Sequence, residues 1–111
     1  MTFEEQNLAV FHEVYTPEVI EWISVRAKSD SGFDLLHQML TGTRERLAID
    51  RAHFARFLRF AKERNGLDAD RLRRLRKPED YAAWKATHNE LLVPYFFAKA
   101  FGLTISFTIV P

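Results

Sequence analysis

Glycines and prolines divide this chain into segments of helical length. Thr16 and Pro17 place an N-cap residue directly before a proline at a first helical position. Gly66 and Gly102 each follow a long stretch with apolar residues at helical spacing. Proline favours the start of a helix and glycine its end. The positions of these residues therefore predict a series of helices joined by short connections. The sequence therefore predicts a mainly α fold, a compact single-domain helical bundle of five or six helices over residues 1–111.

Capping residues set the expected boundaries of these helices. Thr2 and Glu5 form a capping-box sequence at the first N-terminus. The expected helices run from Thr2 to about Tyr15, from Pro17 to about Lys28, from the turn Ser29–Gly32 to Gly42, from a cap at Thr43 or Asp50 to Asn65, from Asp68 to Lys77, and from Pro78 to Gly102. Residues 103–111 are β-branched and alternating, which predicts an extended C-terminal arm or strand.

The expected core follows from helical spacing of large apolar residues. With 47% hydrophobic residues and ten phenylalanines, a chain of 111 residues can bury one core. The predicted core residues are Phe3, Leu8, Val10, Phe11, Val14, Val19, Ile20, Ile23, Ala27, Phe33, Leu36, Met39, Leu40, Phe54, Phe57, Leu58, Ala61, Leu72, Leu75, Tyr81, Trp84, Leu91 and Tyr95. The absence of cysteine excludes disulfides and thiolate metal sites.

Charge is distributed unevenly along the sequence. Residues 1–43 carry seven acidic and two basic side chains, a net charge of −5. Residues 44–77 carry ten arginines and two lysines against five acids, a net charge of +7. Segregation of this kind bears on binding partners rather than on the fold.

Several side chains of the basic segment lie, at 3.6 residues per turn, away from the expected core face of their helices. We call these residues the arginine face. Its members, the candidate partner-binding residues, are Arg56, Arg59, Phe60, Arg73, Arg74 and Arg76. Arginine and aromatic side chains are enriched in protein–protein interfaces, and guanidinium groups suit acidic surfaces. Two structural alternatives stay open: the acidic N-terminal helices neutralise these arginines, and Phe60 covers a neighbouring helix.

The leading functional hypothesis is a non-enzymatic protein–protein interaction module, a small adaptor, regulator or inhibitor that docks the arginine face on an acidic partner. The runner-up is a nucleic-acid-binding regulator that uses the same arginines on phosphates. No helix-turn-helix signature or zinc knuckle accompanies the arginines, and the sequence pI of about 8.1 is modest for a nucleic-acid binder.

Metal binding and catalysis rank third. Asp34 with His37 and Asp50 with His53 have the i, i+3 spacing that helical di-iron sites use. Chance alone accounts for such pairs, and we predict no metal site and no cofactor. Nucleophile elbows, phosphate-binding glycine loops and zinc-protease motifs are missing, so we predict no enzymatic activity. His88 interrupts an apolar stripe, which indicates either a core histidine or a ligand-facing one.

Residues 91–111 form a stretch of 21 residues with a single charge, Lys99, and a membrane span needs roughly 20 apolar residues. Pro94 and Gly102 interrupt this segment, so it is expected to form a buried terminal helix and a strand instead. The polar, acidic N-terminus does not resemble a signal peptide. These features predict a cytoplasmic protein without a membrane anchor, with homodimerisation through residues 103–111 as a possibility.

Overall fold

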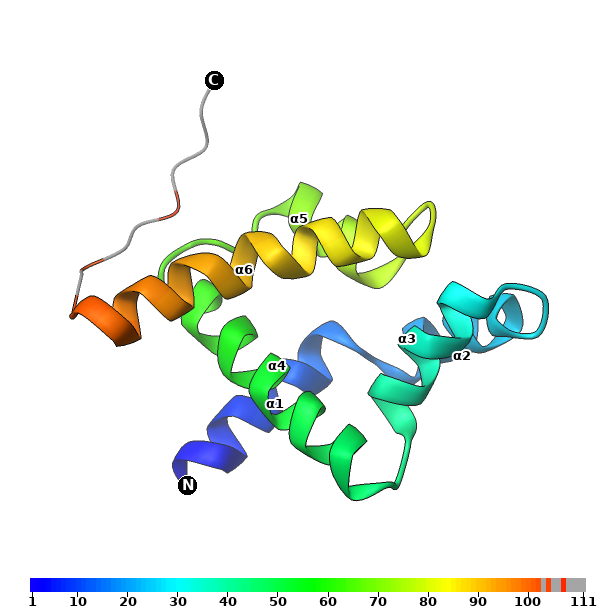
Figure 1. Cartoon of the computed structure of the whole chain (residues 1–111), viewed down its shortest axis with the longest axis horizontal. Helices are drawn as coiled ribbons and strands as arrows, with labels where there is room; N and C mark the ends of the chain where they lie inside the picture. The colour runs from blue at the N-terminus through cyan, green and yellow to red at the C-terminus, as the bar shows by residue number, and fades with distance from the viewer. Residues whose placement is uncertain (103, 105–106, 108–111) are drawn as a thin grey trace.

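The computed structural model describes residues 1–102, 104 and 107, and six α-helices make up most of this part (Figure 1). They are α1 (Phe3–Val14), α2 (Pro17–Ala27), α3 (Ser31–Thr41), α4 (Glu45–Glu63), α5 (Ala69–Arg76) and α6 (Tyr81–Phe101). The prediction of a mainly α bundle is confirmed. The predicted C-terminal strand, and dimerisation through it, fall largely on residues outside those described.

Helix α4 is the centre of the bundle. It packs against α1, α3 and α6, while α2 packs on α3 and α5 on α6. Figure 1 shows α6 crossing above α4, with the α2–α3 pair at the opposite end of the molecule from the C-terminal end of α6. None of the helices described combines the length and the apolar character needed to cross a bilayer.

Two predicted caps, Thr2 and Thr16, are confirmed, and Asp68, predicted as the first residue of a helix, is the N-cap of α5. Thr2, Thr16 and Asp68 each precede a helix, and each side chain accepts a hydrogen bond from the backbone N–H three residues later. These bonds satisfy N–H groups that the first helical turn leaves without a partner. The sequence therefore located the starts of α1, α2 and α5 correctly.

The predicted turn at Ser29–Gly32 is wrong in its second half. Asp30 is the N-cap of α3, and its Oδ1 accepts hydrogen bonds from the N–H groups of Gly32 at 2.8 Å and Phe33 at 3.1 Å. Because Asp30 accepts from two backbone N–H groups of the first turn, a helix is favoured over a turn here. Gly32 therefore lies inside the first turn of α3.

Two further N-termini differ from the prediction. Helix α4 begins after Arg44, whose side chain makes no capping bond, and not after Thr43 or Asp50. Asp50 instead lies within α4. Helix α6 is capped by Asp80 rather than opened by Pro78, because the Asp80 carboxylate accepts the Ala83 N–H at 2.8 Å.

The end of α4 shows why a glycine follows it. The helix ends at Glu63, and the residue with left-handed backbone is Asn65, at φ 59°. Asparagine tolerates this conformation better than most side chains. Gly66 is needed for a different reason: a Cβ there would lie 2.7 Å from the Phe107 ring.

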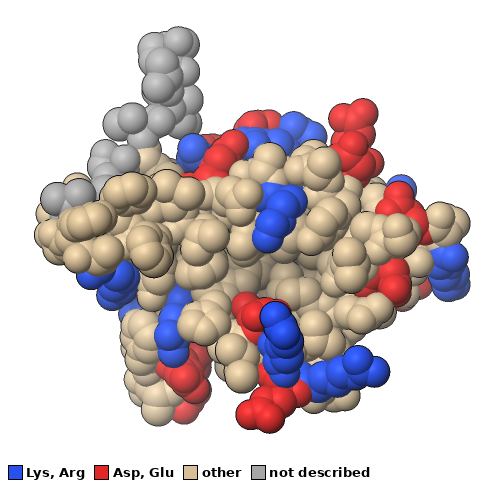
Figure 2. All heavy atoms as spheres, in the orientation of Figure 1, with Lys and Arg blue, Asp and Glu red and all other residues tan. Residues whose placement is uncertain are grey.

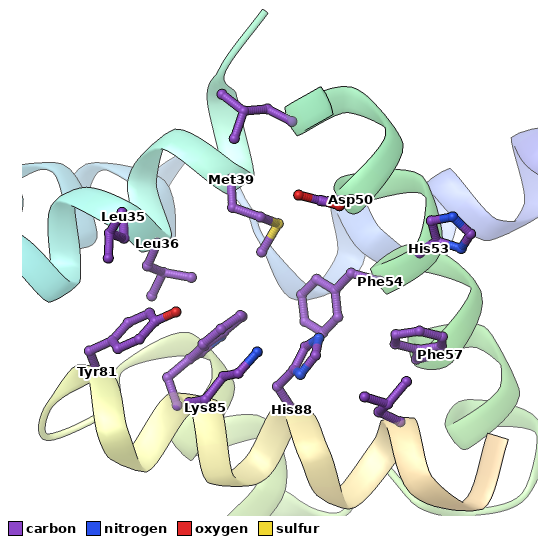
Figure 3. Close-up of a pocket in the computed structure, with 13 residues that line it drawn as sticks. Leu35, Leu36, Met39, Asp50, His53, Phe54, Phe57, Tyr81, Lys85 and His88 are labelled. Atoms are coloured by element: carbon purple, nitrogen blue, oxygen red, sulfur yellow. The ribbon is translucent and has the colours of Figure 1, made fainter. Parts of the chain in front are cut away.

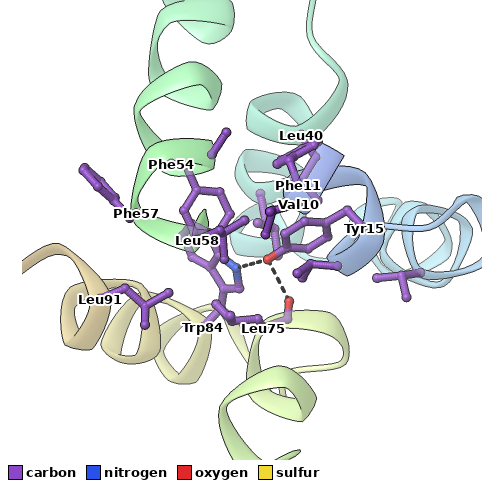
Figure 4. Packing of buried hydrophobic residues seen from close by; sticks show 14 of the residues in the cluster. Val10, Phe11, Tyr15, Leu40, Phe54, Phe57, Leu58, Leu75, Trp84 and Leu91 are labelled. Atoms are coloured by element: carbon purple, nitrogen blue, oxygen red, sulfur yellow. Dashed lines mark hydrogen bonds between the residues drawn. The ribbon is translucent and has the colours of Figure 1, made fainter. Parts of the chain in front are cut away.

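The core is centred on aromatic side chains from α1, α4 and α6 (Figure 4). Tyr15 is buried between Phe11 and Phe54, and its hydroxyl donates to the Leu75 carbonyl at 3.0 Å. The same oxygen accepts the Trp84 indole N–H at 2.9 Å. Burial raises the pKa of the Tyr15 hydroxyl, although the bond from Trp84 opposes this, so the group stays neutral.

Most of the predicted core residues are buried or packed against the buried cluster. Phe3 and Leu8 are exceptions, because both are exposed on the surface of α1. Phe60, whose role the sequence left open, is buried. The C-terminal half of α6, expected to be buried, leaves Phe96, Phe97 and other apolar residues exposed.

Candidate functional site

The arginine face does not form one surface. Its α4 members contact the N-terminal half of α1, where Arg56 pairs with Glu4 and Arg59 bonds to Asn7. Its α5 member Arg76 contacts the opposite end of α1, at Val14. A helix of 12 residues is about 18 Å long. The two groups of arginines therefore lie toward opposite ends of α1.

The α4 arginines are partly neutralised within the fold. Arg56 lies 3.7 Å from the Glu4 carboxylate, and Arg59 lies 2.9 Å from that of Glu63. Arg59 also donates to the buried Asn7 amide oxygen at 3.4 Å, and both guanidinium groups lie over the Phe3 ring. The acidic N-terminal segment thus neutralises part of the basic segment, as one of the two structural alternatives predicted.

Phe60 packs into the structure. Its ring meets Tyr95 edge-on at 5.4 Å and Phe107 at 6.2 Å, between ring centroids. The Arg64 guanidinium covers it, 3.8 Å from the ring centroid. A partner could reach little of this ring in the structure described.

Arg74 joins α5 to α6. It donates to the Thr87 hydroxyl at 3.0 Å and pairs with Glu90 at 3.1 Å and with Asp70 at 3.1 Å. Arg71 reaches the same Glu90 carboxylate at 3.0 Å. Partial burial acts to raise the pKa of Glu90, but the hydrogen bonds and charges of Arg74 and Arg71 outweigh burial and hold that pKa below its usual value.

The two remaining α5 arginines differ in role. Arg76 donates to the backbone carbonyls of Val14 at 3.0 Å and Glu13 at 2.8 Å, at the C-terminal end of α1. A cation there satisfies carbonyls that the helix leaves open and complements the helix dipole. Arg73 is exposed and pairs only with Asp70, within the part of the chain that the structure describes.

Acidic and basic side chains are interspersed on the face drawn in Figure 2. Four of the five arginines in the arginine face bond to a different helix in residues 1–102, and the fifth, Arg73, pairs within its own helix. The basic segment therefore holds helices together to a large extent.

A second surface feature is an open groove between α3, α4 and α6 (Figure 3). Its volume is about 500 Å³, within the usual range of ligand-binding clefts. We call it the α3–α4–α6 groove. It is lined by Leu35, Leu36, Met39, Leu47, Asp50, His53, Phe54, Phe57, Tyr81, Trp84, Lys85, His88 and Leu92.

The groove has an apolar floor and a polar rim. Figure 3 shows Asp50 on the α4 side, and Lys85 on the α6 side pointing into the gap. Asp50, His53 and Lys85 are all exposed, so the rim carries both signs of charge in contact with water. Such an arrangement suits a ligand with an apolar side and a polar side.

His88 lies in the groove wall among aromatic rings. Its centroid lies 5.2 Å from that of Trp84, 5.4 Å from Phe54 and 5.9 Å from Phe57. Burial lowers the pKa of His88, a hydrogen-bond contact with Asn89 opposes this, and the nearby Lys85 charge lowers the pKa further. His88 is thus half-buried against core rings and also lines the groove, and the ligand-facing role that the sequence offered as one alternative stays a prediction.

Metal-binding side chains do not gather in residues 1–102. No three histidines, aspartates or glutamates there come close enough to hold an ion, the two acid–histidine pairs included. Asp50 and His53 both line the groove, while Asp34 accepts a hydrogen bond from Gln38 at 2.8 Å.

No protein-family model, curated protein or solved structure matches this chain. The groove and the contacts of the arginines are therefore the observations that bear on function.

Sequence reasoning missed the groove for a physical reason. Its floor consists of residues such as Leu36, Met39 and Trp84, which have the same helical spacing as core residues. Whether such a side chain is covered depends on how three helices meet, and periodicity along one helix does not contain that information. The interruption of the apolar stripe by His88 was the one local signal.

Proposed function

We propose that this protein is a non-enzymatic protein–protein interaction module whose binding surface is the α3–α4–α6 groove. The observation that carries the proposal is the groove itself, with its apolar floor and charged rim. The arginine face, expected to be the docking surface, is a weaker candidate because its guanidinium groups already have partners in the fold.

The groove chemistry favours an amphipathic helix as the bound segment. Three helices form the walls, and helices with apolar residues at i, i+3, i+4 and i+7 bind in grooves of this kind. Asp50 and Lys85 lie on different walls, so the partner helix is expected to carry a basic residue facing Asp50 and an acidic one facing Lys85. This charge pattern sets the orientation of the bound helix.

Selection from a displayed library of helical peptides tests the proposal. We expect the full chain to select peptides with the apolar spacing described above. Leu35→Glu places a charge on an exposed groove residue and is expected to weaken binding of a selected peptide about tenfold or more, about 1.4 kcal/mol. Ile49→Glu makes the same change at an exposed α4 residue outside the groove and should leave binding unchanged.

Two outcomes contradict the groove as the binding surface. One is a selection that yields no binder. The other is peptide binding that survives Leu35→Glu but is lost in Arg73→Glu, which would return the function to the arginine face. Binding of duplex DNA or RNA that falls steeply between low and moderate salt would instead favour the nucleic-acid alternative.

A further inference from the structure

The C-terminal half of α6 carries an exposed apolar stripe that the groove does not include. Val93 is 50% exposed, Phe96 62%, Phe97 46% and Phe101 64%, with the exposed Ala100 between them. Their spacing of i, i+3, i+4, i+7 and i+8 places all five on one side of a helix. We call these five residues the α6 stripe.

The stripe faces away from the bundle. On the other side of α6, Trp84 and Leu91 are buried, and Tyr95 packs on Phe57 with 4.9 Å between ring centroids. At 3.6 residues per turn, these positions lie about half a turn from the stripe. Lys99 lies over the Tyr95 ring, 5.7 Å from its centroid, so the one charged residue of this helical half belongs to the bundle side.

The described end of the chain lies on the bundle side as well. Phe107 packs beside Phe60, lies close to Gly66, and has the Arg71 guanidinium 5.4 Å from its ring centroid. These are contacts with α4, α5 and their connection, on the side of α6 that Tyr95 occupies. Phe107 therefore lies on the bundle side of α6 and does not cover the stripe.

A lipid surface is a poor match for the stripe. Helices that lie on membranes carry several lysines or arginines along their polar face. Lys99 is the only basic residue from 91 to 102. The stripe itself contains no charged or hydrogen-bonding side chain, so its best complement is another apolar helical surface of similar length.

We propose that the α6 stripe docks a second copy of this chain, with the two α6 helices packed side by side about a two-fold axis. A two-fold interface uses the same patch on both copies, which an uncharged stripe allows without placing like charges together. With about 200 Å² for each phenylalanine, the stripe exposes on the order of 400 Å² of apolar surface. The two copies together bury less than the roughly 1,200 Å² of a stable interface, so the dimer is weak and concentration-dependent.

Sedimentation velocity of the full chain over a wide concentration range tests this inference. The weight-average mass is expected to rise from 13.0 kDa toward twice that value as concentration increases. Phe97→Glu and Phe101→Glu should each hold the mass at the monomer value. Val25→Glu, the same charge at an exposed apolar residue of α2, should dimerise like the parent chain.

A chain that ends at Thr104 separates the stripe from the C-terminal segment. It should still dimerise, with Phe97→Glu again abolishing association; circular dichroism checks that each variant keeps its helices.

The inference is overturned by a monomer at every concentration, by dimerisation that Phe97→Glu leaves intact, or by loss of dimerisation in the shortened chain. Flotation of the parent chain with anionic vesicles, abolished by Phe97→Glu, would identify a lipid surface as the occupant instead. The groove proposal stands or fails separately, because none of these variants alters a groove residue.

Discussion

At the scale of single residues, polar groups inside this protein are bonded to specific partners. No buried side-chain nitrogen or oxygen lacks a hydrogen bond in the part of the chain described. The Tyr15 hydroxyl, at the end of α1, bonds to Leu75 of α5 and to Trp84 of α6. Removing such a hydroxyl leaves other buried groups without a partner, which costs more than the bond itself contributes.

Tyr15→Phe is therefore expected to lower the free energy of unfolding by about 1–3 kcal/mol. The change removes the acceptor of the Trp84 indole N–H and the donor to the Leu75 carbonyl, both buried. Urea denaturation followed by circular dichroism measures the loss. Tyr81→Phe is the matched control, because no hydrogen bond of the Tyr81 hydroxyl occurs in the described residues; an equal loss in both variants would contradict this role of Tyr15.

His88 predicts a dependence of stability on pH. Because burial lowers its folded pKa below the ordinary value of 6.5, the unfolded chain binds the proton more readily. The folded state is therefore expected to lose stability as pH falls below about 6.5, until pH passes the folded pKa. Well above pH 6.5, His88 is neutral in both the folded and the unfolded chain, and its titration no longer changes the stability.

Chemical denaturation between about pH 7 and pH 5 measures this dependence. His88→Phe keeps an aromatic ring among Phe54, Phe57 and Trp84 but does not titrate, so its stability should change less over this range. His12→Asn, at an exposed site on α1, should keep the parent slope. A parent-like slope in His88→Phe would assign the pH dependence to other groups.

At the scale of elements, arginines fix α5 to its neighbours. This helix has eight residues, too few to be stable alone in water. Arg74 bonds to Thr87 and Glu90 of α6, and Arg76 bonds to the end of α1. The packing of α5 thus depends on polar bonds as well as on the buried Leu75.

Two neighbouring substitutions separate these roles. Arg74→Met removes the guanidinium that donates to the buried Thr87 hydroxyl and pairs with Glu90, and it is expected to cost about 1–3 kcal/mol of unfolding free energy. Arg73→Met, at a side chain that is 63% exposed, should cost less than about 1 kcal/mol, as is typical of surface ion pairs. Denaturant titration of both variants, compared with the parent chain, gives the difference; equal costs would contradict the assignment.

Elements were also the level at which the sequence was most informative. Thr2, Thr16 and Asp68 form caps through bonds within four residues, so local sequence predicts them. The start of α4 after Arg44 has no side-chain cap and gave no such signal. Asn7, which bonds to Arg59, and Val14, which bonds to Arg76, lie more than 50 residues from those arginines in the sequence, and only the packing of α1 brings them close.

At the scale of the whole molecule, an uneven sequence of charges folds into a surface of mixed charges. The acidic first helix lies against the basic fourth helix, with Glu13 and Lys62 2.7 Å apart as one of the contacts. Carboxylates of the same chain therefore pair with much of the positive charge that suggested an anionic partner. An open groove with an apolar floor and a charged rim lies between α3, α4 and α6.

The two tryptophans allow a direct test of the groove as the binding surface. Trp84 lines the groove, whereas Trp22 on α2 lies outside it and packs against Phe33 and Arg26. The measurement is the ¹H–¹⁵N spectrum of the two indole groups while a selected helical peptide is added. We predict that the Trp84 indole signal shifts in proportion to peptide binding while the Trp22 signal stays in place; bound peptide with an unchanged Trp84 signal would contradict the groove as the site.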